Sequence, residues 1–205
     1  YYFVISPRQE IRNIFQEAPL RRFLKLAGLL LPIGYIWLSR LFFVKVLTIL
    51  LVASLVIDIL RFLFPRFNHR YLKLKSIAKQ KELKTFSGYT IFLISALLLF
   101  LVFPKEIAVL SLTLFIIGDI AAPFAGLWFL PKRMISEKTW GGFVLVFVFT
   151  VFAGYFLKFL TPLSITLEMI LAGAFLTALL DQFSFLLDDN ILVPLGTAVV
   201  LTLLT

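Results

Sequence analysis

Seven apolar stretches constrain this chain more than any other feature of its sequence. A helix needs about 20 mostly apolar residues to cross the hydrocarbon core of a bilayer. The stretches near that length cover residues 23–39, 41–64, 87–103, 107–130, 142–160, 164–180 and 191–205. Because 61% of the residues are apolar and only 15% are charged, a water-soluble fold and a disordered chain are both excluded. The sequence therefore predicts an all-α, polytopic integral membrane protein of about seven transmembrane helices.

We expect one transmembrane domain over residues 1–205, with two basic segments at the membrane surface. Residues 1–22 alternate Arg with Ile and Phe, which predicts an amphipathic, interfacial lead-in. Residues 65–86 form a basic loop. The net charge of +9 indicates anionic membrane lipids and phosphorylated substrates as partners, and no nucleic acid is expected. The absence of Cys excludes disulfides, thiolate metal sites and a thiol nucleophile.

The distribution of Lys and Arg predicts the orientation in the membrane. Of the 20 basic residues, 16 precede or open the first span, run from Arg61 to Lys84, or lie between spans four and five. The other four are Arg40, Lys45, Lys105 and Lys158. Since basic residues in short loops stay in the cytoplasm, we expect a cytoplasmic N-terminus and an external C-terminus. The membrane would be the plasma membrane of a prokaryote or an ER-like membrane.

Four of the ionisable residues in or at the end of the apolar spans are the main functional signal: Asp58, Arg61, Asp119 and Asp181. Such residues cost ~2.5–3.5 kcal/mol each at the centre of a membrane helix, so they need a function or a partner. All four fall in the middle or the predicted cytoplasmic half of their spans, where we expect a polar cluster. Asp58 and Arg61 are three residues apart and can pair on one helix face. A purely structural pair is the alternative.

The fourth span combines Asp119 with small residues at every fourth position, Gly118, Ala122 and Gly126. Small residues let another helix or a ligand approach the backbone, and they offer a face for a homodimer. Pro123 cannot donate to the carbonyl of Asp119, which predicts a kink or an opening. A carboxylate beside a free carbonyl suits a divalent cation. Helix packing alone is the alternative.

Two further motifs follow in segments between spans. Lys138, Thr139, Gly141 and Gly142 can place backbone N–H groups and a charge against a phosphate, although a basic cytoplasmic loop is also what topology requires. Residues 188–190 are Asp188, Asp189 and Asn190, whose oxygens suit Mg²⁺. Asp188 would share a helix face with Asp181 if the preceding helix continues. Alternatively, Asp189 or Asn190 is the N-cap of the last helix.

The order of these motifs resembles the CTP-dependent membrane lipid kinases, which comprise dolichol kinase, phytol kinase and fungal diacylglycerol kinase and are related to phosphatidate cytidylyltransferases. The matching positions are Glu17, Arg21, Arg22 and Lys25; Asp58 and Arg61; Glu82 and Gly88; Gly118, Asp119, Ala122 and Gly126; Lys138, Thr139 and Gly142; Asp189, Asn190 and Pro194. This chain has Lys25 where the family has His, Gly141 where it has Glu, and Asp181 where it has Glu. The long basic signature of the cytidylyltransferases is absent, which favours the kinases.

The resemblance implies transfer of the CTP γ-phosphate to a polyprenol, a phytol-like alcohol or diacylglycerol at the cytoplasmic face, with Mg²⁺ as cofactor. The implied catalytic residues are Asp58, Asp119 and Asp181. Those implied to hold CTP are Arg21, Arg22, Lys25, Arg61, Glu82, Lys138, Thr139, Gly141 and Gly142. Those implied to bind the metal are Asp119, Asp188, Asp189 and Asn190.

Three other functions compete with a lipid kinase. A cytidylyltransferase would use the same site, attack the α-phosphate and release pyrophosphate. A small cation-coupled transporter would use Asp58, Asp119 and Asp181 as an ion path, but the predicted cluster sits on one side of the membrane. A scaffold that only binds anionic lipid leaves the acidic run at residues 188–190 unexplained.

Overall fold

The computed structural model describes residues 25–64, 85–124, 139–183 and 187–205. Within these ranges the chain is helical and contains no strand, which confirms the all-α prediction. The helices are α3 (Leu30–Trp37), α4 (Arg40–Leu63), α6 (Gly88–Val102), α7 (Lys105–Ala121), the short 3₁₀ helix η2 (Ala122–Phe124), α9 (Trp140–Leu160), α10 (Leu167–Gln182) and α11 (Asp189–Leu204).

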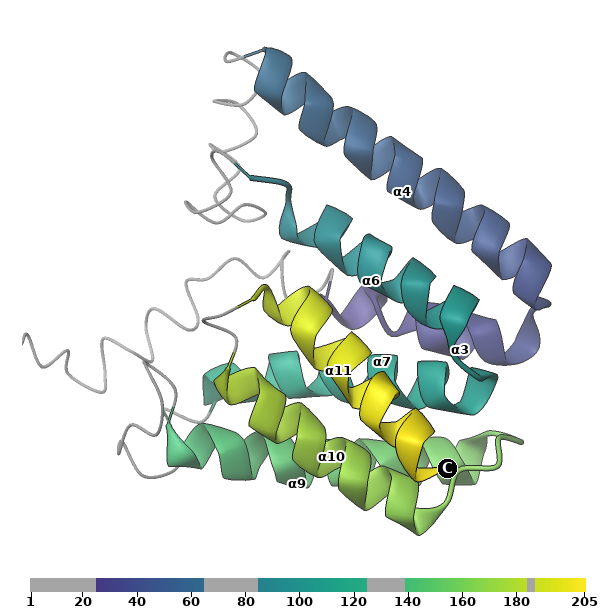
Figure 1. Cartoon of the computed structure of the whole chain (residues 1–205), viewed down its shortest axis with the longest axis vertical. Helices are drawn as coiled ribbons and strands as arrows, with labels where there is room; N and C mark the ends of the chain where they lie inside the picture. The colour runs from purple at the N-terminus through teal and green to yellow at the C-terminus, as the bar shows by residue number, and fades with distance from the viewer. Residues whose placement is uncertain (1–24, 65–84, 125–138, 184–186) are drawn as a thin grey trace, which may run out of the picture.

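Each of the seven predicted apolar stretches overlaps one of the α-helices, and consecutive helices run in opposite directions (Figure 1). Three helical segments are long and apolar enough to cross a membrane: 40–63, 105–124 and 140–160. The apolar helices 25–37, 88–102 and 189–204 are shorter. The count of seven spans is therefore not confirmed and stays a prediction. The predicted lead-in, 1–22, and nearly all of the basic loop lie outside the described residues.

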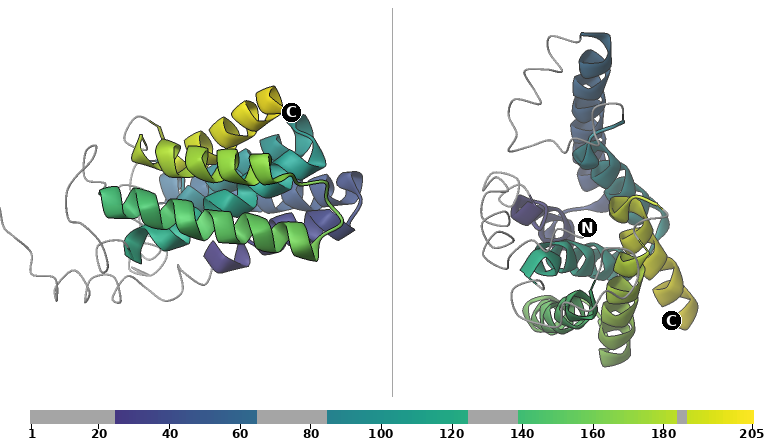
Figure 2. Two further views of the ribbon diagram at one scale, coloured as in Figure 1. Left: turned by 90° about the horizontal axis from the view of Figure 1, so that it is seen from below. Right: turned by 90° about the vertical axis from the view of Figure 1, so that its left-hand side faces the viewer.

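Helix α7 forms the core of the bundle. It packs against α3, α6, α9, α10 and α11, and 67% of its apolar span is buried inside the protein. The corresponding values are 22% for α9 and 17% for α4. Helix α4 lies at one edge and packs mainly on α6 (Figures 1 and 2). The outer helices expose many large apolar side chains, as expected of a surface that faces lipid.

The small residues predicted on the fourth span are used for packing inside the chain. A Cβ atom added to Gly118 would lie 3.1 Å from Cγ1 of Val146 on α9 and 3.3 Å from Cγ2 of Thr177 on α10. Gly118 therefore lets α7 approach both helices closely. It is not available to a second copy of the chain, and Gly126 lies outside the described residues.

Pro123 ends α7 as expected. The α-helix stops at Ala121 and continues as the single 3₁₀ turn η2, because proline has no N–H to donate to the carbonyl four residues earlier. This break fixes Asp119 in the last turn of α7.

Two basic residues at the opposite end of the bundle satisfy the ends of other helices. Nε of Arg40 donates to the carbonyl of Phe100 at 3.0 Å, and its Nη2 donates to that of Leu101, both in the last turn of α6. Nζ of Lys105 donates to the carbonyl of Ile36 in α3 at 2.8 Å. Carbonyls in the last turn of a helix lack intrahelical partners and carry partial negative charge, so they attract cations.

Candidate functional site

The candidate site residues come together at one end of the bundle. The C-terminal ends of α4, α7 and α10 and the N-terminal ends of α6, α9 and α11 all lie at the left of Figure 1. Antiparallel packing of consecutive helices produces this arrangement, because every second connection returns to the same end. It places Asp58, Asp119, Asp181, Thr139 and Asp188 at that end, as the sequence predicts. Among the described residues, three groups of contacts are found there.

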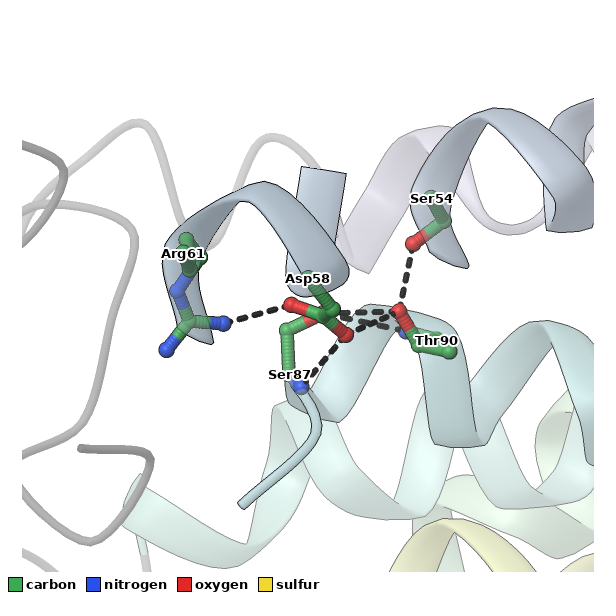
Figure 3. A network of polar contacts seen from close by, with 5 residues as sticks. All are labelled: Ser54, Asp58, Arg61, Ser87 and Thr90. Atoms are coloured by element: carbon green, nitrogen blue, oxygen red, sulfur yellow. Dashed lines mark hydrogen bonds and ion pairs between the residues drawn. The ribbon is translucent and has the colours of Figure 1, made fainter. Parts of the chain in front are cut away.

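The first group surrounds Asp58, which is fully buried (Figure 3). Arg61 donates from Nη1 to Oδ1 of Asp58 at 2.5 Å, so the predicted pair is confirmed. Oδ2 accepts from the backbone N–H of Ser87 at 2.9 Å, from its hydroxyl at 3.1 Å and from the hydroxyl of Thr90 at 2.6 Å. Thr90 also contacts the hydroxyl of Ser54 at 2.6 Å.

These contacts join the C-terminal end of α4 to the start of α6. Ser87 is the N-cap of α6, and its hydroxyl accepts from the N–H of Thr90. The carboxylate of Asp58 accepts four hydrogen bonds, all from groups of the protein itself. Taking a proton from a substrate would require it to give up one of these donors. The geometry therefore favours a positioning role for Asp58, and the catalytic assignment stays a prediction.

The second group is the ion pair of Lys25 with Asp119. Asp119 lies in the last turn of α7, where the helix dipole disfavours an anion, and the ammonium group compensates for this. About a quarter of each side chain is exposed, 26% for Lys25 and 24% for Asp119. The contact brings Lys25, one of the residues implied to hold CTP, next to Asp119.

The third group begins α11. Oδ1 of Asp188 accepts from the backbone N–H of Asn190 at 3.0 Å and from its amide Nδ2 at 2.7 Å. The amide also donates to Oδ1 of Asp189 at 3.2 Å. Asp188 is thus the N-cap, and the expectation that Asp189 or Asn190 would be the cap is wrong by one or two residues. Helix α10 ends at Gln182, so Asp181 and Asp188 do not share one continuous helix.

The start of α9 carries the remaining described motif. Thr139 is its N-cap and accepts from the N–H of Gly142 at 3.1 Å. Gly141 and Gly142 are buried in the first turn, which contains no acidic residue. Since the first N–H groups of a helix lack intrahelical acceptors, this turn can bind an anion.

The acidic residues form no closed metal cage. In the ranges that the structure describes, no three His, Cys, Asp or Glu side chains lie close enough to hold a metal ion. Mg²⁺ in nucleotide enzymes is commonly held by one or two carboxylates together with substrate phosphates, and it keeps several waters. The adjacent carboxylates of Asp188 and Asp189, with the carbonyl oxygen of Asn190, fit such an open site. In this structure the amide nitrogen of Asn190 faces the two carboxylates, so its oxygen would reach a shared cation only after the amide turns over. Asp119 contacts Lys25 and stays a separate candidate.

Several predicted residues lie outside the described ranges: Arg21, Arg22, Glu82 and Lys138. Conversely, sequence reasoning gave no role to Ser54, Thr90 or Gln182. Ser54 stands four residues before Asp58, one helical turn, and Gln182 directly follows Asp181. Polar residues so close to an intramembrane carboxylate are the signal that could have identified them.

One curated protein supports the resemblance derived from the motifs. The chain is 28% identical over 173 residues to "CTP-dependent diacylglycerol kinase 1" of Eremothecium gossypii, and the match covers 72% of this chain and 54% of that relative. The resemblance to CTP-dependent lipid kinases is confirmed. The chain spans about half the length of the relative it matches. No family model matches the chain. No solved structure matches it either.

Proposed function

We propose that this chain is a CTP-dependent lipid kinase, with diacylglycerol the first acceptor to test. The lipid hydroxyl oxygen would bond to the γ-phosphorus of CTP, the bond from that phosphorus to the β,γ-bridging oxygen would break, and CDP would leave. The observation that carries the proposal is the gathering of the candidate carboxylates and helix N-termini at one end of an apolar bundle. At such an end a soluble nucleotide can meet a lipid head group.

Phosphoryl transfer requires mainly positioning and neutralisation of charge. We assign the phosphates to the first turn of α9, with Lys138, Arg21 and Arg22 supplying positive charge. Asp181, in the last turn of α10, would orient the lipid hydroxyl and accept its proton. Asp58 would position the start of α6.

Mg²⁺ would be held by Asp188, Asp189 and Asn190. The ion pair of Lys25 with Asp119 would lie beside the phosphates. When bound, Mg²⁺ would neutralise negative charge on the phosphates. Asn190 already donates to both carboxylates, so it holds them together in the free protein. This arrangement stays a prediction until metal dependence is measured.

The direct test is transfer of label from γ-labelled CTP in detergent with Mg²⁺. Diacylglycerol, a polyprenol, a phytol-like alcohol and phosphatidate would be offered separately. Label in the lipid fraction would establish the kinase and identify its acceptor. Pyrophosphate release with phosphatidate would establish a cytidylyltransferase instead, and no consumption of CTP with any lipid would point to transport.

Two variants connect activity to the site. Asp119→Asn and Asp189→Asn should remove nearly all turnover while the protein remains monodisperse and folded, because each loses a charge and little volume. Wild-type rates in both variants would contradict the assignment of these residues.

A further inference from the structure

Gln182, the last residue of α10, is a buried side chain whose polar groups have no partner. Its exposed fraction is 1%, and neither Nε2 nor Oε1 has a hydrogen-bond partner in the part of the chain that the structure describes. Buried polar groups are nearly always hydrogen-bonded, because burying them unpaired raises the free energy of the fold. An unpaired buried carboxamide therefore indicates a group that the described part of the chain does not supply.

Gln182 lies on the side of α10 that faces α9. It follows Phe175 by seven residues, or two turns, so the two share a side of the helix. The ring of Phe175 contacts that of Phe143 on α9, with centroids 5.9 Å apart. The Gln182 side chain thus leaves α10 on the side of the helix that carries this contact with α9.

A second contact fixes how far along α9 Gln182 lies. A Cβ atom on Gly154 would lie 2.7 Å from Cγ2 of Ile170, so these two residues are opposite one another. Gln182 lies roughly 18 Å beyond Ile170 along α10. Because α9 is antiparallel to α10, the same distance from Gly154 toward the start of α9 leads to Gly142.

By the Gly154–Ile170 contact, the backbone of Gln182 is level with the first turn of α9. The N–H groups of Trp140 and Gly141 precede the N–H that Thr139 caps, and the first N–H groups of a helix have no acceptor within it. Such N–H groups favour an anion. Gln182 adds a neutral donor, Nε2, and a neutral acceptor, Oε1, at this level. A phosphate oxygen could accept from Nε2 but would leave Oε1 without a donor.

We infer that Gln182 binds the hydroxyl group of the lipid acceptor beside the phosphates. The inference rests on the proposed function. A primary carboxamide presents its donor and acceptor side by side, and an alcohol O–H can accept from Nε2 and donate to Oε1 together. A ribose hydroxyl has the same chemistry. The lipid is favoured because Gln182 is buried within an apolar bundle, which a charged nucleotide enters at greater cost.

The decisive variant is Gln182→Leu, which keeps the volume and removes both polar groups. We expect this variant to be more stable and to bind the lipid alcohol more weakly. The melting temperature of the free protein should rise, because no unpaired amide remains buried, and KM for the lipid alcohol should rise about tenfold with KM for CTP unchanged. A lower melting temperature would show a structural role and overturn the inference. A rise in KM for CTP alone would assign Gln182 to the nucleotide and overturn the choice of the lipid.

Ser111→Ala is the matched control. Ser111 is also fully buried and its Oγ has no partner among the described residues, but it lies on α7 roughly 10 Å, or seven residues, further into the bundle than Gly118. Its replacement should leave both KM values unchanged. Equal KM changes in the two variants would show a general effect of core polarity and contradict the inference.

A binding measurement separates this inference from the proposed function. Without CTP, the melting temperature should rise on adding diacylglycerol but not triacylglycerol, which lacks the hydroxyl, and Gln182→Leu should abolish the difference. If the wild type shows this difference but transfers no label, the kinase proposal fails and the hydroxyl site stands. If label is transferred and Gln182→Leu keeps both the lipid KM and the difference, the inference fails and the kinase stands. Absence of the difference in the wild type would also overturn the inference.

Discussion

Asp58 and Arg61 are two charged residues within an apolar helix. Their exposed fractions are 0% and 1%, so both are buried. Each loses its hydration on burial, and the ion pair with the hydrogen bonds from Ser87 and Thr90 compensates for that loss. For such pairs, removing one partner is more destabilising than replacing both, because a lone charge then remains buried.

We predict that Asp58→Leu destabilises the protein by about 3–5 kcal/mol, since it leaves Arg61 buried without its carboxylate. The double variant Asp58→Leu/Arg61→Leu should recover much of that loss. The melting temperature in detergent measures both effects. Thr48→Val is the control, because Thr48 is an exposed residue of α4 whose hydroxyl bonds only to the carbonyl of Val44 in the contacts described.

Label transfer by the double variant then separates structure from chemistry at Asp58. Recovery of both stability and turnover would show a structural pair. Recovered stability without turnover would show that the carboxylate takes part in the reaction, contrary to the positioning role inferred from its four donors.

Substitution can separate capping of α11 by Asp188 from its proposed binding of Mg²⁺. Asp188→Ala removes the N-cap of α11 and should cost about 1 kcal/mol, whereas Asp188→Ser keeps a capping oxygen and should cost much less. If the carboxylate also binds Mg²⁺, both variants should need a higher Mg²⁺ concentration for half-maximal turnover. Normal Mg²⁺ dependence in the serine variant would limit Asp188 to capping.

At the scale of helices, close approach through glycine determines how α9, α10 and α7 pack. Gly154 meets Ile170, Gly118 meets Thr177, and Gly173 would place a Cβ 2.8 Å from Cδ1 of Leu114. Lipid is as apolar as these side chains, so packing rather than burial from water holds such helices together. The contact at Gly154 is the least adaptable of the three, because the β-branched Ile170 has few rotamers in a helix.

We predict that Gly154→Ala destabilises the bundle by about 1–3 kcal/mol, because its methyl group would overlap Cγ2 of Ile170. Alanine has a higher helix propensity than glycine by about 1 kcal/mol, which opposes the destabilisation. A net loss of stability would therefore show that the overlap with Ile170 costs more than this gain. The double variant Gly154→Ala/Ile170→Val should regain stability. Exposed Val148 provides the control, since Val148→Ala should change the melting temperature little. A more stable Gly154→Ala variant would contradict the packing.

At the scale of the whole molecule, antiparallel helices put the candidate site at one end and the connection 161–166 at the other (Figure 1). The second end holds Arg40 and Lys105, which bond to helix carbonyls. These two cations therefore serve the fold at the end that we predict to be external.

Because the chain contains no Cys, single cysteines can test its orientation directly. Thr85→Cys, at the site end, should react with a membrane-impermeant thiol reagent only from the cytoplasmic side. Ser164→Cys, in the opposite connection, should react only from outside. Ala108→Cys, buried in α7, should stay unlabelled until the protein is denatured. The reverse pattern for Thr85→Cys and Ser164→Cys would show that the predicted orientation is wrong.

Part of the candidate site could be predicted because its determinants are local. The i, i+3 spacing predicted the Asp58–Arg61 pair, and Pro123 predicted the end of α7. The cap of α11 was misplaced because three consecutive polar residues can all cap, and only the backbone conformation selects Asp188. The partners Ser87 and Lys25 are 29 and 94 residues from Asp58 and Asp119, a separation at which spacing carries no information.

The sequence by itself determined the helical, membrane-adapted character of this protein, the place of each helix and the lipid kinase resemblance, because apolar length, proline and motif order act locally or along the chain. Only the tertiary structure decided which helix is central, which helices require a small residue at position 118, and which polar residues contact one another. Those outcomes depend on packing between distant segments. Gln182 illustrates the difference: as a residue it is an ordinary amide at a helix end, and only the burial imposed by neighbouring helices leaves it without a partner.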